Sequence, residues 1–312
     1  MIESGAARSA HARYRGRFAP SPTGPLHFGS LVAAMASYAD ALAAAGEWLL
    51  RIEDVDVPRA RPGAADAIVA ALDRLGFEWA GHVWRQAERT THYEQALEYL
   101  RAQDAIYPCM CTRSERARDA IGRVGERVYP GVCAADSDAL RAKRRRSAMR
   151  VRVPTSIIGF TDRLQGRVEQ QLAADVGDFI VRRSDGLFAY QLAVVVDDAA
   201  QGITDVVRGA DLLASTPRQI FLQRVLGFST PRYLHVPVAL DPRGRKLSKH
   251  LGARALPDAP LDALLSAWRF LDQPAPRETP STVAEFWAWA RAHWTVARLP
   301  PVSMLPAPAA YN

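Results

Sequence analysis

The segment Pro20-Ser21-Pro22-Thr23-Gly24-Pro25-Leu26-His27-Phe28-Gly29-Ser30 lies at a predicted strand-to-helix turn near the N-terminus. Residues 13–19 favour a short strand before it, and residues 30–45 are rich in strong helix formers, between Ser30 and Gly46. Glycines let the backbone approach a ligand closely, and the N–H groups and dipole of a helix N-terminus favour an anion. The segment therefore predicts a phosphate-binding turn in a parallel α/β sheet.

A second segment, Arg245-Lys246-Leu247-Ser248-Lys249-His250, forms a basic loop flanked by glycines beyond the middle of the chain. Lys246 and Lys249 could reach the oxygens of a pyrophosphate, and flexible lysines suit negative charge that develops only during a reaction. His27 in the first segment can donate to a phosphate oxygen. Taken alone, the loop could be a solvated basic loop, and His27 could be a helix cap or a core residue. Together the two segments predict binding and activation of a nucleoside triphosphate.

Alternating strands and helices surround both segments and predict a doubly wound parallel sheet. The expected strands are at 48–52, 192–196, 205–208 and 233–240, and the expected helices at 64–75 and 216–226. The run at 192–196 is entirely apolar, as in a buried parallel strand. Near the C-terminus, one helical face carries an aromatic stripe that should face the core: Phe286, Trp289, Ala290 and Trp294.

Residues 107–185 break this alternation and predict an insertion. We expect a flexible leader at 1–13, a catalytic domain in two halves at 14–106 and 186–257, and a short helical region at 258–312. A transit peptide is the alternative for the leader.

Composition narrows the class of protein. The net charge of +7 and the pI near 9.6 favour a polyanionic partner, although many basic proteins bind no nucleic acid. No apolar run approaches the roughly 18 residues of a membrane helix. Three cysteines cannot form a closed set of disulfides, which favours a metal in a reducing compartment and therefore the cytoplasm.

The cysteines themselves suggest the metal. Cys109 and Cys111 are separated by one residue, and Cys133 follows a Pro-Gly turn, so three thiolates could share a tetrahedral zinc. Such a zinc would be structural, because four protein ligands leave no open position. Ordinary buried thiols are the alternative.

These motifs resemble a known family. Arg17-Phe18-Ala19-Pro20-Ser21-Pro22-Thr23-Gly24, running into His27-Phe28-Gly29-Ser30, resembles the HIGH signature of class I aminoacyl-tRNA synthetases, and Lys246-Leu247-Ser248-Lys249-His250 resembles their KMSKS loop. Arg51-Ile52-Glu53-Asp54 and Gly202-Ile203-Thr204-Asp205-Val206-Val207-Arg208-Gly209 are similar to the glutamyl and glutaminyl subgroup. Ser30 and His250 depart from the two signatures. The resemblance covers about residues 14–257 and implies a class I Rossmann-like catalytic domain with a zinc-containing insertion that contacts tRNA.

The resemblance also implies the roles of individual residues. For L-glutamate, Arg17 and Arg208 would flank the substrate, Glu53 would receive the α-amine, Tyr190 would offer its hydroxyl, and Ser21 would join them. ATP, with magnesium, would contact Pro20, Gly24, His27, Gly29, Ser30, Lys246 and Lys249. The catalytic groups would be His27, Lys246 and Lys249, and Tyr129 would be the fourth zinc ligand. The Asp197-Asp198 pair could hold magnesium or act as a structural cap.

Only residues 258–312 follow the lysine loop. In this respect the chain resembles a truncated branch of the glutamyl synthetases, which lacks the anticodon-binding portion. The branch implies activation of glutamate to glutamyl-adenylate without tRNA, followed by transfer to the queuosine base at the anticodon wobble position of tRNA(Asp). We expect a cytoplasmic monomer without a membrane partner. No residue is an obvious general base for the transfer. The alternatives are a minimal glutamyl-tRNA synthetase that charges the tRNA 3′ end and a catalytically silent, zinc-containing RNA-binding module. The basic run at 141–146 could contact tRNA phosphates or form a solvated helix.

Overall fold

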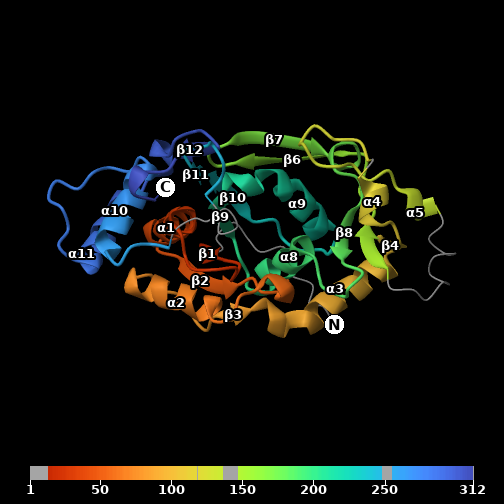
Figure 1. Ribbon diagram of the computed structural model, residues 1–312, viewed down its shortest axis with the longest axis horizontal. Coiled ribbons are helices and arrows are strands. Elements are labelled where there is room, and N and C mark those ends of the chain that lie inside the picture. The colour runs from red at the N-terminus through yellow and green to blue at the C-terminus, as the bar shows by residue number, and fades with distance from the viewer. Residues whose placement is uncertain (1–12, 118, 136–146, 248–254, 312) are drawn as a thin grey trace.

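A parallel sheet joins the first part of the chain to its central part (Figure 1). The computed structural model describes residues 13–117, 119–135, 147–247 and 255–311. Strands β1 (Arg15–Phe18), β2 (Glu47–Ile52) and β3 (Trp84–Arg85) pair in parallel, as do β9 (Asp205–Gly209) and β10 (Arg232–Val236). β9 lies beside β1, where the Thr204 N–H donates to the Arg15 carbonyl at 3.0 Å. The predicted parallel α/β fold is confirmed.

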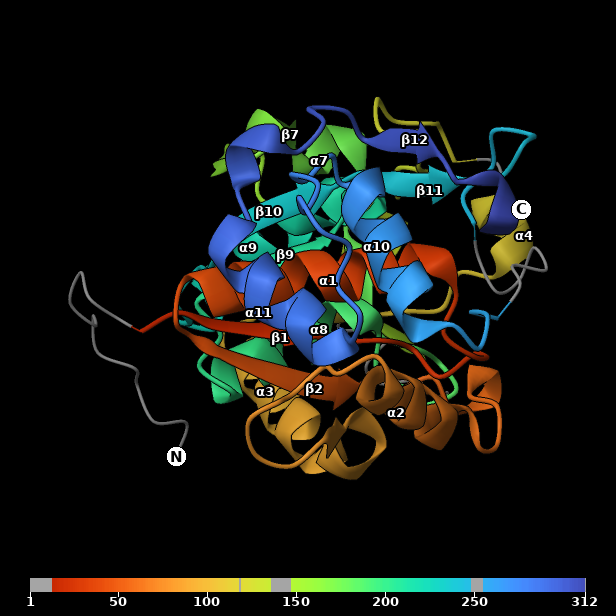
Figure 2. The same ribbon diagram turned by 90° about the vertical axis from the view of Figure 1, so that its left-hand side faces the viewer.

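Both faces of this sheet are buried, and the side chains of β9 and β10 alternate between two cores. Val207 and Leu234 belong to a core shared with α1 (Phe28–Ala43), α2 (Ala64–Arg74), α10 (Pro260–Phe270) and α11 (Val283–His293). Val206 and Tyr233 belong to a second core, shared with α3 (Thr90–Ala102), α8 (Tyr190–Ala200) and α9 (Thr216–Val225). Figure 2 shows α1 between the sheet and the C-terminal helices. Helices on both faces are what a buried parallel sheet requires.

Helix α1 (Phe28–Ala43) begins two residues before the predicted start at Ser30. Its N-cap is His27, whose side chain accepts a hydrogen bond from the Ser30 N–H. Gly46 lies just after the helix, where an added Cβ would be 2.5 Å from the Tyr14 carbonyl oxygen. Only glycine therefore allows the chain to turn into β2 at this point.

The strand predicted at 192–196 is wrong, because these residues lie inside α8. All five are buried, between the sheet and neighbouring helices, in the second core. A helix that is buried on every side shows no amphipathic period, so an apolar run within it cannot be distinguished from a buried strand.

The strand predicted at 233–240 is divided in two. β10 ends at Val236, and β11 (Val238–Leu240) follows Pro237 and pairs with β12 (Met304–Pro306). Proline has no N–H for a sheet ladder, which accounts for the break.

Residues in the predicted insertion form antiparallel structure of their own. β4 (Ile106–Cys109), β5 (Ala148–Val151) and β8 (Phe179–Arg182) make one sheet, and β6 (Ile157–Asp162) with β7 (Gly166–Gln171) makes a hairpin. The short helices here are α4 (Arg113–Arg116), α5 (Val132–Ala135) and α7 (Leu172–Asp175). The boundaries predicted for the domains stay predictions, and the basic run at 141–146 lies outside the described residues.

The aromatic stripe of α11 does face the core. Phe286, Ala290 and Trp294 are buried, and the half-buried Trp289 packs on Trp268 with ring centroids 5.2 Å apart. Trp287, which the stripe omitted, is also buried and donates from Nε1 to the Leu75 carbonyl at 2.8 Å. Within the described part of the chain, no helix has the length and apolar character needed to cross a membrane.

Candidate active site

A cavity of about 670 Å³ opens at the carboxyl ends of β1, β2, β9 and β10. Ligands bind at this edge of open parallel sheets. Most of the predicted site residues line the cavity: Arg17, Pro20, Ser21, His27, Gly29, Ser30, Glu53, Tyr190, Arg208 and Lys246. Gly24 is buried in the turn but is not part of the cavity lining. Lys249 and His250 lie outside the described residues.

The two sequence segments lie against each other at the mouth of this cavity. His27 forms an antiparallel bridge with Ala255, just beyond the lysine loop, and the Leu256 N–H donates to the Leu26 carbonyl at 3.3 Å. A Cβ added to Gly29 would lie 3.3 Å from the His27 ring and 3.5 Å from the Leu247 carbonyl. The contact with the ring is the tighter one, so glycine here leaves room for the His27 side chain at the helix start.

His27 combines a structural contact with a position in the cavity wall. Its Nδ1 accepts from the Ser30 N–H at 3.4 Å, and its Nε2 is 3.0 Å from the Ser30 hydroxyl. Since Nδ1 accepts, the neutral ring carries its proton on Nε2. Ser30 thus orients His27. Ser30 occupies the position at which the HIGH signature has its second histidine.

Lys246 is paired with Asp211, a residue that the sequence did not single out. Its ammonium forms an ion pair with the Asp211 carboxylate, and both side chains line the cavity. The Lys246 side chain is 47% exposed, so it keeps one face in the open part of the cavity.

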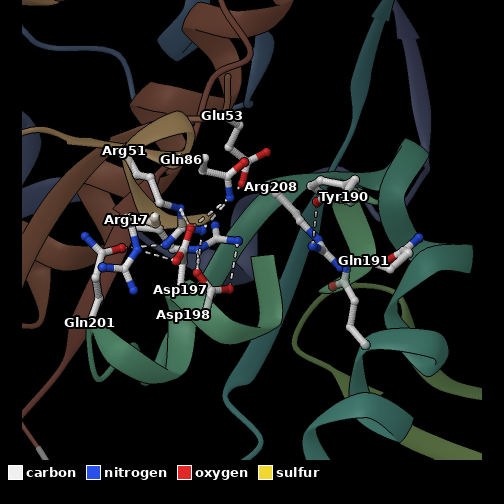
Figure 3. A network of polar contacts seen from close by, with 12 residues as sticks. Arg17, Arg51, Glu53, Gln86, Tyr190, Gln191, Asp197, Asp198, Gln201 and Arg208 are labelled. Atoms are coloured by element: carbon white, nitrogen blue, oxygen red, sulfur yellow. Dashed lines mark hydrogen bonds and ion pairs between the residues drawn. The ribbon is translucent and has the colours of Figure 1, made fainter. Parts of the chain in front are cut away.

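Figure 3 shows a buried network of arginines and aspartates beneath the cavity. Arg17 contacts both carboxylate oxygens of Asp198, and Arg51 donates to Asp198 at 2.7 Å and to Gln201 at 2.5 Å. Burial alone would raise the pKa of Asp198, but these two arginines hold the pKa below its usual range. Asp197 accepts hydrogen bonds from Gln86, Arg89 and Tyr93.

The Asp197 and Asp198 carboxylates therefore balance buried arginines. This arrangement gives neither the magnesium site nor the structural cap considered from the sequence.

Glu53 extends from the end of β2 into the cavity. Burial raises its pKa to about 7, against the opposing effect of Arg51, whose Nη2 is 3.5 Å away. Gln86 lies beside it in Figure 3 and donates to Asp197 at 2.9 Å. The Gln86 Oε1 is buried without a hydrogen-bond partner among the described residues. Two acceptors in this corner suit a positively charged group of a ligand.

Arg208 and Tyr190 form the opposite wall. Arg208 Nη1 is 3.4 Å from the Tyr190 hydroxyl, and Nη2 donates to Thr216 Oγ1 at 2.8 Å. Its Nε contacts His235 Nε2 at 3.1 Å, and His235 Nδ1 contacts Asp162 at 2.7 Å. A permanently charged guanidinium with free N–H groups suits a carboxylate.

The cavity therefore offers Lys246, paired with Asp211, and an inner pocket with both charges. Sequence reasoning missed Arg51, Asp211 and His235, although Arg51 carries a visible signal as a charged residue inside an otherwise apolar strand.

The three cysteines form a separate cluster. Their sulfurs all lie within 4.8 Å of one another, and the Tyr129 hydroxyl is 3.5 Å from the sulfurs of Cys109 and Cys111. A tetrahedral zinc with Zn–S bonds of about 2.3 Å holds sulfurs about 3.8 Å apart, and Cys111 and Cys133 are 3.5 Å apart. The donor set and its spacing fit such an ion.

The Arg150 guanidinium covers the Tyr129 ring at 3.9 Å. Burial raises the pKa of Cys111 to about 11, whereas hydrogen bonding with Tyr129 and Arg150 outweighs burial and lowers the pKa of Cys109.

Comparison with known proteins shows the family to which the chain is similar. Residues 13–259 match the family described as tRNA synthetases class I (E and Q), catalytic domain. A glutamyl-Q tRNA(Asp) synthetase of Dechloromonas aromatica is 55% identical over 300 residues, which cover 95% of this chain and 99% of that protein. One of Pseudomonas aeruginosa is 51% identical over 295 residues, which cover 94% of this chain and 97% of that protein.

A solved glutamate tRNA ligase from Elizabethkingia meningosepticum shares the fold, with a TM-score of 0.80 at 24% identity over 96% of this chain and 68% of that one.

Proposed function

The chain belongs to the class I tRNA synthetases for glutamate and glutamine, and on that basis we propose that it activates L-glutamate with ATP and transfers it to the queuosine base of tRNA(Asp). The observation that carries this proposal is that described residues of both synthetase segments line one cavity together with charged residues of both signs. The glutamyl-Q tRNA(Asp) synthetases matched over 97–99% of their length support the choice of acceptor.

In the first step, an oxygen of the α-carboxylate attacks the α-phosphorus of ATP, and pyrophosphate leaves. Glu53 receives the ammonium group of glutamate, while Arg208 and Tyr190 bind a carboxylate and Arg17 and Ser21 complete the pocket. Glu53 acts as a carboxylate here, so substrate binding favours its ionised form.

The phosphates lie at the mouth of the cavity, where Pro20, Gly24 and Gly29 shape the turn. His27, with Ser30 as its partner, and the lysines Lys246 and Lys249 stabilise the charge that develops on the departing pyrophosphate. ATP binds as its magnesium complex, with the ion held mainly by the phosphates.

In the second step, a hydroxyl of the cyclopentene ring of queuosine attacks the carbonyl carbon of glutamyl-adenylate, and AMP leaves. The phosphate of AMP is the proposed acceptor of the hydroxyl proton.

A tRNA substrate favours a reaction in the cytoplasm. The protein is proposed to act as a monomer, because the described cavity wall comes from one chain.

The cysteine cluster is proposed as a structural zinc site formed by Cys109, Cys111, Tyr129 and Cys133. The ion would hold the loop after β4 against α5 and so keep the inserted segment in the shape that docks tRNA.

Glutamate-stimulated exchange of pyrophosphate into ATP in the absence of tRNA tests the first step. We expect exchange with glutamate alone. Exchange that requires tRNA would favour the minimal glutamyl-tRNA synthetase, and no exchange under either condition would favour the catalytically silent module.

A further inference from the structure

His235 lies behind Arg208, outside the cavity lining, in the middle of a buried chain of contacts. His235 Nδ1 is 2.7 Å from Asp162 Oδ2, and His235 Nε2 is 3.1 Å from Arg208 Nε. His235 is fully buried, Asp162 is 2% exposed and Arg208 is 6% exposed. The chain joins the β6–β7 hairpin to the cavity wall through β10 and β9.

The partners determine the tautomer of His235. An ionised Asp162 can only accept, so Nδ1 carries the proton, and Arg208 can only donate, so Nε2 must present its lone pair. Burial and the neighbouring Arg208 lower the pKa of His235 to about 4, which keeps the ring neutral. A neutral ring with Nδ1–H satisfies both neighbours, and its Nε2 also lies 3.1 Å from Thr216 Oγ1.

This contact restricts how the guanidinium of Arg208 can lie. Its Nε–H and one N–H of Nη2 are taken by His235 and by Thr216 Oγ1, which together hold one edge of the planar group. The other edge, formed by Nη1 and Nη2, remains available to a ligand, and its Nη1 lies beside the Tyr190 hydroxyl. That edge can bind a carboxylate through two parallel hydrogen bonds.

We propose that His235, set by Asp162, is a positioning residue that orients Arg208 toward the carboxylate of the substrate and so sets the affinity for glutamate. This inference rests on the proposed binding of glutamate at Arg208. His235 acts through Arg208 and touches no substrate atom.

Two substitutions at His235 separate its two contacts. In His235→Asn, the side-chain amide stands near the place of Nδ1, so it can still donate to Asp162 but leaves Arg208 Nε without an acceptor. In His235→Gln, the amide reaches the place of Nε2, and its oxygen can accept from Arg208. Both remove the ring, so their effects on packing are similar.

Asp162→Asn offers an independent variant. Asp162 Oδ1 accepts from the backbone N–H groups of Leu164, Gln165 and His235, which fixes an amide oxygen at that side. The amide NH2 then faces His235 Nδ1, so the ring proton moves to Nε2. There it opposes the Nε–H of Arg208 and can donate only to Thr216 Oγ1, which lies 3.1 Å away. This variant tests the same contact without changing the histidine.

The test measures the KM for glutamate at saturating ATP and the KM for ATP at saturating glutamate, by pyrophosphate exchange. We expect His235→Asn and Asp162→Asn each to raise the KM for glutamate about tenfold or more, the effect of one hydrogen bond to a charged group, without a similar rise for ATP. His235→Gln should stay within about twofold of the wild type. Tyr14→Phe, which removes a buried hydrogen bond to Asp40 away from the cavity, controls for lost stability.

Equal KM values for glutamate in the Asn and Gln variants of His235 would overturn the inference, as would parallel rises for ATP and glutamate. Urea unfolding of each variant identifies any that does not fold, and Asp162→Asn then carries the test. An inactive wild type would instead contradict the proposed function.

Discussion

Arg17 and Asp198, 181 residues apart in the chain, are joined by two hydrogen bonds, from Nε to Oδ1 at 3.1 Å and from Nη2 to Oδ2 at 3.3 Å. The pair ties β1 to α8 directly beneath the cavity. Arg51 shares the same carboxylate and also lies 3.5 Å from Glu53 and 3.9 Å from Asp197.

Asp198→Asn should destabilise the protein by about 3–5 kcal/mol, because the buried Arg17 loses the carboxylate with which it pairs and Arg51 loses the nearest of its three. The measurement is the free energy of unfolding in urea. The matched control is Asp66→Asn, which removes the carboxylate of an exposed pair with Arg85 and should have no measurable effect. Equal effects of the two substitutions would show that the buried network adds no stability.

The role proposed for Glu53 predicts that the KM for glutamate depends on pH. Its pKa near 7 means that about nine-tenths of the side chain is ionised at pH 8 and about one-tenth at pH 6. Because only the carboxylate pairs with the ammonium group of the substrate, the KM for glutamate should rise about tenfold from pH 8 to pH 6. Glu53→Gln should raise the KM at pH 8 and remove most of this dependence. A KM that is independent of pH in the wild type would contradict the role given to Glu53.

Lys246 is expected to act on the transition state. Lys246→Ala should lower kcat for pyrophosphate exchange about 10²–10³-fold, the usual effect of losing one preorganised charge. Arg245→Ala is the control, because Arg245 belongs to the same loop but pairs with Asp241 outside the cavity lining. If both variants lose the same activity, the effect comes from the loop and not from the ammonium group.

The proposed zinc site predicts different effects on the two steps of the reaction. Cys111→Ser should lose most of the bound zinc, measured by elemental analysis, and impair transfer to tRNA while leaving most of the glutamate activation. Tyr129→Phe should weaken zinc binding if the hydroxyl is the fourth ligand. Met110→Leu, in the same loop, is a control that removes no thiol. Loss of pyrophosphate exchange in a Cys111→Ser protein that stays folded would contradict a structural role confined to the insertion.

The sequence alone predicted those parts of the fold that depend on local residue patterns. The strand-to-helix turn at 20–30 could be predicted because its prolines and glycines are typical of a turn and strong helix formers follow it. Phosphate binding by this turn and by the loop around Lys246 stays a prediction. Helix α1 was predicted with its start two residues late, because His27 caps the helix although histidine is not a typical cap.

Contacts between distant parts of the chain could not be predicted in the same way. The partners of Arg51 lie 147 and 150 residues away, and His235 meets Asp162 at a separation of 73 residues. The apolar run at 192–196 failed for a related reason, because packing on all sides of α8 removes the period that distinguishes a helix from a strand.

The most direct test of the central claim is the transfer of radiolabelled glutamate to tRNA(Asp) with and without queuosine, using the purified full-length chain with ATP and magnesium. The account predicts labelling of the queuosine-containing tRNA and none of an unmodified transcript, and the label should remain when the 3′-terminal nucleotide is removed. Equal labelling of both tRNAs, or labelling of neither, would contradict it.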